Sequence, residues 1–443
     1  MSGAVDADYL WNEPTVHSSQ LGVSWPTALS QLGANARRAG LLYVHFGPWP
    51  PWLWVLAQGA AVQAATINFY FIGDPLPLDL AAECPMNCHW LPLNSHGLLD
   101  RIELLLNVSR SNVSGIVDAN GAPLGGYYGT RKLCDLKPFW PALFPELTSR
   151  HEWIGYADDD IVFGDLASEV AHLGKEDELL VPVAFYPEPL ANGNFLLMRA
   201  NLKMVHAYRR SAWRQVLRSP FYMRFDEWGG ELDHYDANAS SSGRRVASEG
   251  GFDHDGEGSA TMRAVYSDMV LSGELCARPT RRLLVQDTIV QLGRHFPSLN
   301  TFGGQTELRW MRDGRLIAER IGPCVCPRDV VAQFGLSMCS QCLRNPGANL
   351  KQVTTHRRLE VLGFHFLYWK KNWRMREHAL RRKNNGTRPN TSAVPPYPVP
   401  APCPASQGWT LREHTGFVCD ADSHRLRPLF AKSRTKSRGK AIR

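Results

Sequence analysis

Residues 41–72, LLYVHFGPWPPWLWVLAQGAAVQAATINFYFI, decide the fold class of this chain. Residues 41–46 form a short apolar and aromatic run that stops at Gly47 and Pro48, which predicts a buried strand. Residues 51–65 begin with proline and are apolar nearly all round, which predicts a buried helix, and residues 66–72 predict a second strand. Strand, helix and strand within about 35 residues form a βαβ unit, so the sequence predicts a parallel sheet.

The alternation of strands and helices continues beyond this unit. A helix is expected behind Ser95, because the apolar residues between positions 98 and 106 share one face, and residues 130–148 are also expected to be helical. Residues 153–157, 179–185 and 194–199 predict further strands. The predicted fold class is therefore α/β, a mixed and mainly parallel sheet flanked by helices, with ligands at the carboxyl ends of the strands.

Composition predicts the domain boundaries. Residues 1–39 are polar and irregular and form an N-terminal appendage, and a single folded domain is expected over residues 40–383. Inside it, the Gly-, Ser- and acid-rich residues 229–260 predict a mobile insertion, and residues 320–345 hold a cysteine cluster. Residues 384–443 predict a proline-rich linker and a disordered basic tail.

The formal net charge of +7 suggests an anionic partner such as nucleic acid. Residues 370–383 carry a net +6, and residues 425–443 carry eight basic and no acidic side chains, so the remaining chain has a net charge of −7. An acidic body of this kind argues against nucleic acid as the partner. The basic tail carries a separate hypothesis, a peripheral contact with an anionic membrane surface.

Membrane and compartment signals are few. The chain has no uninterrupted apolar run of about 18 residues, so no transmembrane segment is expected, and its N-terminus lacks the pattern of a signal peptide. Ten cysteines and five Asn-X-Ser/Thr sequons favour a glycoprotein of the secretory-pathway lumen (Golgi) over a cytoplasmic protein. The sequons begin at Asn107, Asn112, Asn238, Asn385 and Asn390.

Three acids, Asp158, Asp159 and Asp160, come directly after the strand at residues 153–157. Carboxylates at positions i and i+2 on a turn that leaves a sheet can both face a divalent ion. Such hard oxygen ligands suit Mg²⁺ or Mn²⁺, which also bind phosphate oxygens. The alternative is a solvated acidic turn.

The Asp158-X-Asp160 pattern resembles the DxD motif of GT-A-fold glycosyltransferases, and its surroundings resemble one GT-A-like family associated with polysaccharide synthesis. The resemblance covers about residues 41–373 and departs in the insertion, the cysteine cluster and the basic tail. It implies a GT-A-like fold. The segments that carry it are Lys132-Leu-Cys134-Asp135-Leu-Lys137-Pro138, Trp153-Ile-Gly155-Tyr156, Asp158 to Asp160, Gly164-Asp165, Phe225-Asp226-Glu227-Trp228, Phe364-His365-Phe366 and Trp369-Lys370-Lys371.

The resemblance also implies ligands for the metal and the donor. Asp158, Asp160 and His365 are the expected ligands of Mn²⁺ or Mg²⁺, although a lone histidine between apolar residues is equally a core residue. Asp159 is expected on the donor side. Lys370 and Lys371 are expected to neutralise charge on a diphosphate, and their alternative is a solvated basic run.

Other candidate donor contacts have two interpretations each. Asp135 and Lys137 lie on opposite sides of Leu136 and either bind the base or ribose of a nucleotide or pair within the fold. Asn192, before Gly193, is either close to a sugar or part of a plain turn.

Asp226 and Glu227 are the candidate catalytic acids. Either of them can act as a general base on an acceptor hydroxyl in an inverting enzyme. Alternatively, both only bind acceptor hydroxyls in a retaining enzyme, whose leaving phosphate takes the proton.

The cysteines of the 320–345 cluster follow a CxC and CxxC spacing, at Cys324, Cys326, Cys339 and Cys342. This spacing fits a structural Zn²⁺ or two disulfides, and neither arrangement is catalytic.

Together these features predict a metal-dependent glycosyltransferase of the hexosyltransferase type. Its donor would be a nucleotide sugar, a UDP-sugar first among the candidates, and its acceptor a hydroxyl of a glycan or glycoconjugate. The alternative is a non-catalytic carbohydrate- or nucleotide-binding protein on the same fold.

Overall fold

The computed structural model describes residues 37–47, 49–50, 52–75, 85–117, 132–182, 193–220, 222–226, 261–282, 284–286, 305–310, 315–323, 354–365, 409–412 and 416–419. The predictions for the insertion at 229–260, the cysteines at 324–342 and the basic tail lie outside these residues, as do those for Asn192, Glu227, Lys370 and Lys371.

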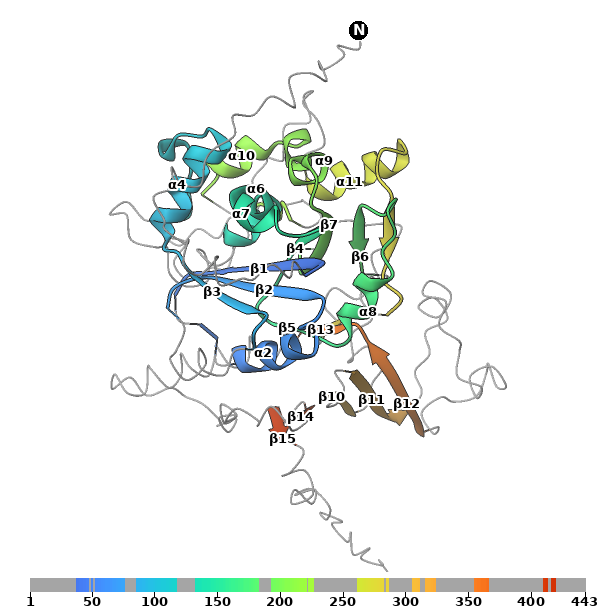
Figure 1. Cartoon of the computed structure of the whole chain (residues 1–443). Helices are drawn as coiled ribbons and strands as arrows, with labels where there is room; N and C mark the ends of the chain where they lie inside the picture. Colours follow the sequence, from blue (N-terminus) through green and yellow to red (C-terminus); the bar gives the residue numbers. More distant parts are fainter. Residues whose placement is uncertain are drawn as a thin grey trace, which may run out of the picture.

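A seven-stranded sheet forms the centre of the fold, in the order β3-β2-β1-β4-β7-β6-β8 (Figure 1). Its strands are β1 (Ala39–His45), β2 (Ile67–Gly73), β3 (Cys88–Pro92), β4 (Trp153–Ala157), β6 (Leu179–Val181), β7 (Phe195–Arg199) and β8 (Ala277–Pro279). β1 pairs in parallel with β2 and β4, and β2 pairs in parallel with β3. β7 runs antiparallel to both of its neighbours, β4 and β6. The predicted α/β class with a mixed, mainly parallel sheet is therefore confirmed.

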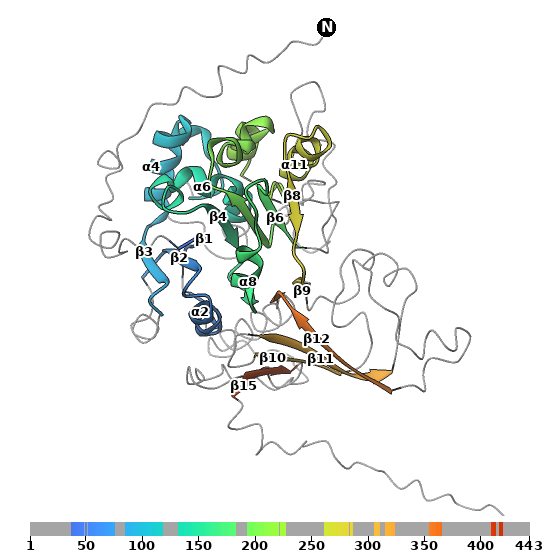
Figure 2. The ribbon, with the colours of Figure 1, turned by 45° about the vertical axis from the view of Figure 1, so that its right-hand side comes forward.

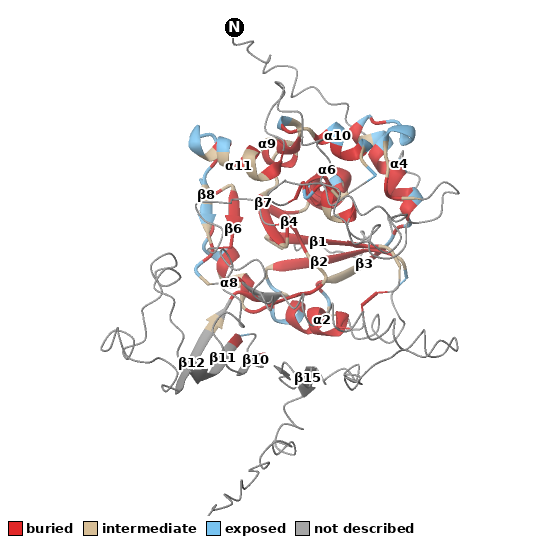
Figure 3. Cartoon of the chain, turned by 180° about the vertical axis from the view of Figure 1, so that it is seen from behind, coloured by how far each residue is buried: buried red, intermediate tan, exposed pale blue. Residues whose placement is uncertain are grey.

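Helices cover both faces of the central sheet (Figures 1 and 3). One face carries α2 (Leu53–Val62) and α8 (Leu166–Ala171), and the other carries α4 (Ser95–Leu106), α6 (Trp140–Leu143), α7 (Pro145–Thr148), α9 (Leu202–Val205), α10 (Trp213–Arg218) and α11 (Met262–Leu271). Along β1, Leu42 and Val44 face the second group, whereas Leu41 and Tyr43 face the first. A strand buried on both faces needs apolar residues at every position, which explains the unbroken apolar run that marks β1.

Two helix predictions differ in detail from the structure. The N-cap of α4 is Asn94, whose side-chain oxygen accepts a hydrogen bond from the Gly97 N–H at 2.8 Å, and the helix begins at Ser95. Residues 132–148 form a helical turn, a 3₁₀ turn at Lys137–Phe139, α6 and α7 in succession. Prolines at the starts of the last three pieces break what the sequence predicted as one helix, because proline removes a backbone donor.

Two smaller sheets accompany the central one. A three-stranded sheet joins β5 (Ile161–Phe163), β13 (Gly363–His365) and β9 (Leu284–Gln286). A five-stranded antiparallel sheet joins β12 (Thr354–Val361), β11 (Leu316–Pro323), β10 (Gln305–Trp310), β14 (Trp409–Arg412) and β15 (Gly416–Cys419). Figure 2 shows the antiparallel sheet beyond α2, on the far side from α4 and α11. Its residues Trp310 and Leu316 pack into the same core as α2.

The antiparallel sheet was not predicted from the sequence. Its strands alternate charged and apolar residues, as in TELRW and LIAER, and lack the apolar runs that mark the central strands. β14 and β15 fall within the segment that the sequence analysis assigned to the linker and tail. Within the described part of the chain, no helix combines the length and apolar character needed to cross a membrane.

Buried polar side chains gather at the amino ends of the central strands. His151 Nδ1 donates to the Arg37 backbone oxygen at 2.8 Å, so its Nε2 accepts from the Tyr70 hydroxyl at 2.7 Å. His89 Nε2 lies 3.1 Å from Asn68 Oδ1 and donates to it. Burial, and secondarily the positive charge of Arg37, lowers the pKa of His89 from its ordinary 6.5 to about 4, and burial also lowers the pKa of His151. Both rings are therefore neutral in the fold at neutral pH.

The first prediction concerns packing in the central sheet. A Cβ added to Gly155 in β4 would lie 2.0 Å from the Leu196 backbone oxygen, where the two backbones pair and neither can move freely. We expect Gly155→Ala to destabilise the fold by about 1–3 kcal/mol or more. Thermal unfolding measures the change. Gly174→Ala is the matched control, because the nearest atom to its added Cβ lies 3.5 Å away. Equal melting temperatures would contradict the observed pairing of β4 with β7.

A second prediction concerns the loss of folding stability in acid. The unfolded chain binds a proton at His89 as the pH falls below 6.5, whereas the folded chain does so only near pH 4, so stability is lost between these values. We expect His89→Gln to flatten the stability profile in this range. Chemical denaturation at pH 7.0 and pH 4.5 measures it, with His96→Gln, an exposed position on α4, as control. A variant whose stability falls as steeply as that of the unmodified chain would exclude this role for His89.

Candidate functional site

The three acids lie at the carboxyl ends of the two central strands. Asp158 to Asp160 form the turn between β4 and β5. From β1 the chain continues to β2 and β3 on one side, whereas β4 pairs with β1 on the other side, so the strand order reverses between β1 and β4. In open α/β sheets, ligands bind outside the carboxyl ends of the strands at such a reversal.

Asp159 ties this turn to β1 and to the start of α2. Its Oδ2 lies 3.0 Å from Nδ1 of His45, the last residue of β1. Its backbone oxygen accepts a hydrogen bond from the Trp52 indole N–H at 2.7 Å. From the sequence, Asp159 was expected on the donor side, and neither His45 nor Trp52 was singled out. The position of His45 at the end of a parallel strand was the signal that could have identified it.

Lys137 joins Asp158 to Asp226. Its ammonium group lies 2.5 Å from Asp158 Oδ1 and 3.1 Å from Asp226 Oδ2, and it donates to the Gly193 backbone oxygen at 2.6 Å. Three acceptors thus match the three donors of a lysine. Burial lowers the pKa of Lys137, but the negative charges around it, Asp158 first, raise the pKa well above its ordinary value. Lys137 therefore stays protonated at neutral pH.

Asp135 orders the segment that carries Asp226. Its carboxylate lies 3.3 Å from Lys132 Nζ and accepts hydrogen bonds from the backbone N–H groups of Met223 at 2.8 Å and Phe225 at 2.9 Å. Burial raises the pKa of Asp135, whereas Lys132 and the two N–H donors lower it. Of the two roles that the sequence left open for Asp135 and Lys137, these contacts correspond to pairing within the fold.

Asp226, a candidate general base in the sequence, is held inside the protein. The residue is fully buried, with Oδ2 on Lys137 and Oδ1 accepting from the Tyr222 hydroxyl at 3.4 Å. A general base has to come within hydrogen-bond reach of an acceptor hydroxyl. In the conformation that the structure shows, the Asp226 carboxylate is a partner of Lys137. The other catalytic candidate, Glu227, lies outside the described residues.

The backbone of His365 lies beside the acid turn, the turn of Asp158 to Asp160 between β4 and β5. β13 pairs antiparallel with β5, and the register places His365 opposite Ile161, the residue that follows Asp160. The side chain of His365 lies outside the described part of the structure. A Cβ added to Gly363, two residues earlier, would lie 3.0 Å from the Val162 backbone oxygen, a tight contact. Glycine thus allows β13 to approach β5 closely.

The donor atoms at this turn fit a divalent cation in kind. Asp158 is partly exposed, and Asp160 is buried at 1% exposure, so the turn offers carboxylate oxygens at two depths. Among the side chains that the structure describes, no three His, Cys, Asp or Glu groups are placed to hold a metal ion. A complete set at this turn therefore requires His365 or another ligand beyond them.

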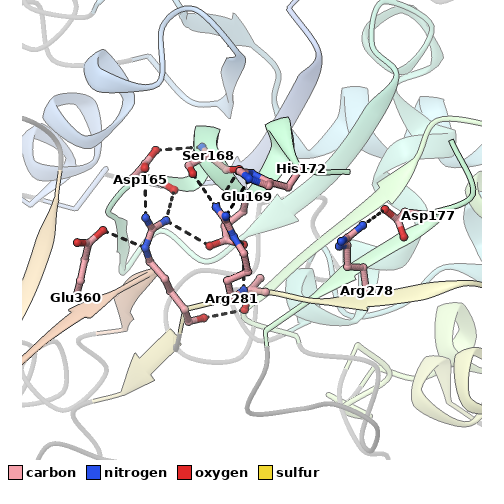
Figure 4. A network of polar contacts seen from close by, with 10 residues as sticks. Asp165, Ser168, Glu169, His172, Asp177, Arg278, Arg281 and Glu360 are labelled. Atoms are coloured by element: carbon pink, nitrogen blue, oxygen red, sulfur yellow. Dashed lines mark hydrogen bonds and ion pairs between the residues drawn. The ribbon is translucent and has the colours of Figure 1, made fainter. Parts of the chain in front are cut away.

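A polar network around the buried Glu169 holds β12, the strand that leads to His365, against α8 (Figure 4). Arg282 lies 3.0 Å from Glu360 in β12, 3.3 Å from Glu169 in α8 and 3.5 Å from Asp165. Arg281 binds the other carboxylate oxygen of Glu169 through its backbone N–H at 3.0 Å. Glu169 is almost fully buried, so the network joins β12 to α8 at a fixed place. None of these residues except Asp165 was singled out in the sequence, because the partners are far apart along the chain.

Asp165 also begins α8, since its Oδ1 accepts a hydrogen bond from the Ser168 N–H at 3.0 Å. The Gly-Asp pair that follows the acid turn therefore has a capping role in addition to its ion pair with Arg282.

Comparison with known proteins gives a family match and fold-level likenesses. Residues 124–248 match the model of a family of unknown function (DUF6625), and no curated protein sequence matches the chain. Several solved structures similar to the chain are glycosyltransferases. Mouse xyloside xylosyltransferase 1 is 12% identical over 42% of this chain and 72% of its own, with a TM-score of 0.24.

Two further sugar transferases give similar values. The galactosyltransferase LgtC, solved with donor and acceptor sugar analogues, is 13% identical over 40% of this chain and 65% of its own, with a TM-score of 0.24. GlyE of Streptococcus pneumoniae is 13% identical over 40% of this chain and 36% of its own, with a TM-score of 0.24.

The Lys137 contacts generate a prediction. Lys137→Met leaves the carboxylates of Asp158 and Asp226 without their shared cation, which we expect to cost about 3–5 kcal/mol of stability. Adding Asp226→Asn should recover part of this loss, because one buried charge is then removed. Denaturant unfolding of both single variants and the double variant measures the coupling. Strictly additive changes would show that the two side chains do not interact.

Proposed function

We propose that this protein is a metal-dependent glycosyltransferase that moves a sugar from a nucleotide sugar to a hydroxyl of a glycan or glycoconjugate. The observation that carries the proposal is the position of Asp158 to Asp160 at the carboxyl ends of β1 and β4, where the strand order reverses. A nucleotide sugar fits a site of this kind, because its diphosphate can bind a divalent cation held by the carboxylates. A UDP-sugar is the first donor to test.

Asp158, Asp160 and His365 are the residues that would hold Mn²⁺ or Mg²⁺ in this proposal. The bound cation would neutralise negative charge on the diphosphate as the bond to the sugar breaks. Lys137 binds one oxygen of Asp158, and the His45 contact holds Asp159. The protein thus orders the acid turn before any ligand arrives, which lowers the cost of binding.

Glu227 takes the role of general base in this proposal. Because Asp226 is enclosed and paired with Lys137, Glu227 is the acid proposed to meet the acceptor hydroxyl. Lys370 and Lys371 remain the proposed contacts of the diphosphate. Substitution of each by an uncharged residue separates these roles, since loss of a diphosphate contact weakens donor binding and loss of an acceptor contact does not.

One experiment tests the central proposal. We expect Asp160→Asn to lower the Mn²⁺-dependent release of nucleoside diphosphate from nucleotide sugars by more than about 100-fold. Substitution of a residue that only orients a metal ligand costs up to about 100-fold, and loss of a direct ligand should cost more. The assay compares a panel of nucleotide sugars with and without Mn²⁺. Glu103→Gln, an exposed carboxylate on α4, is the control, and circular dichroism checks the fold of both variants. Unchanged release by Asp160→Asn would exclude the metal assignment.

A second candidate function is non-catalytic binding of carbohydrate or nucleotide at the same turn. The observation that favours it is the use of Asp135 and Asp226 for contacts inside the protein. Calorimetry with nucleotide sugars, combined with the release assay and a broad set of acceptors, separates the two functions. Binding without any cleavage of the donor would support the second candidate.

A further inference from the structure

Arg224 has a backbone conformation that arginine rarely adopts. Its φ is 52°, in the left-handed region, and within the described residues the other non-glycine case is Asn107. Asn107 caps the end of α4, an ordinary place for a left-handed residue, and asparagine tolerates it. Arg224 caps no described helix, so its conformation needs another explanation.

Asp135 imposes this conformation. Its carboxylate accepts the N–H groups of Met223 and Phe225, the residues on either side of Arg224. Met223, Phe225 and Asp226 are buried, whereas Arg224 is exposed. The Phe225 ring also stacks on Phe139 with their centroids 5.5 Å apart. The segment therefore buries its neighbours and directs the Arg224 residue towards solvent.

The segment that carries Arg224 is linked to the acid turn through the side chain of Lys137. Asp226, two residues after Arg224, shares the Lys137 ammonium group with Asp158. One buried side chain thus connects the segment of Arg224 to the first acid of the Asp158-X-Asp160 motif. Arg224 is exposed on this segment, and a guanidinium group suits an anion because its planar N–H groups match phosphate and carboxylate oxygens.

We propose that Arg224 is a substrate-binding residue that contacts an anionic group, phosphate or carboxylate, at the site. The inference rests on the proposed function, since it names a contact of that same site. Glycine would occupy this position without steric cost, so arginine is present for its side chain. Two sources can supply the anion: the diphosphate of the donor or an acidic sugar of the acceptor.

The experiment separates charge from backbone conformation. Arg224→Asn removes the charge and tolerates a left-handed conformation, Arg224→Gly removes the charge and relieves the backbone, and Arg224→Lys keeps the charge. Arg218→Gln is the control, because Arg218 is also exposed, in the last turn of α10. Calorimetry measures binding of two probes to each protein: UDP with Mn²⁺, and an oligosaccharide containing glucuronic acid.

We expect Arg224→Asn and Arg224→Gly to weaken one probe at least 10-fold while the control binds as the unmodified chain does. Arg224→Lys should bind that probe more tightly than Arg224→Asn. The melting temperature of Arg224→Gly should stay equal or rise, a result that a purely structural role of the side chain would not produce. Weaker UDP binding assigns the anion to the donor, and weaker oligosaccharide binding assigns it to the acceptor.

Two outcomes overturn the inference and differ in meaning. If the unmodified chain binds a probe and both uncharged variants bind both probes equally well, the Arg224 assignment is wrong and the proposed function stands. If the unmodified chain binds neither UDP with Mn²⁺ nor any nucleotide sugar nor the oligosaccharide, the proposed function fails, and the Arg224 assignment fails with it.

Discussion

The ammonium group of Lys137 is the point on which the site depends. It bridges Asp158, at the end of β4, to Asp226, and it also binds the Gly193 backbone just before β7. Desolvation makes a buried lysine costly, and only close opposite charges and complete hydrogen bonding compensate for that cost. Because all three acceptors are required, the segments that carry them have to meet in one arrangement. The acid turn is therefore positioned by the fold itself.

The two ends of the central sheet differ in their charged groups. At the amino ends, burial keeps His89 and His151 neutral, so protonation of these rings in acid lowers the stability of the fold. At the carboxyl ends of β1 and β4, the charged groups of Lys137 and Asp158 lie beside a turn that is partly open to solvent. The length of the parallel strands separates these two ends. A substitution at the histidines is therefore expected to change the stability of the fold without touching the groups at the acid turn.

How much the sequence predicts follows from the range of the interactions. β4 was predicted with its observed bounds, and the βαβ unit was found, because a strand buried on both faces is apolar at consecutive positions. The antiparallel sheet was missed, since its charged and apolar residues alternate. The pairing of Lys137 with Asp226 was also missed. These residues are 89 positions apart, and no local pattern records that they meet.

The antiparallel sheet is connected to the three-stranded sheet beside the acid turn. β12 continues through Leu362 into β13, and the Leu362 backbone oxygen accepts a hydrogen bond from the Gly164 N–H at 2.7 Å, just beyond β5. Arg282 then holds Glu360 of β12 against Glu169 of α8. A shift of one residue between β13 and β5 would move His365 away from its place opposite Ile161. The register set by these contacts thus decides which residue of β13 lies beside the acid turn.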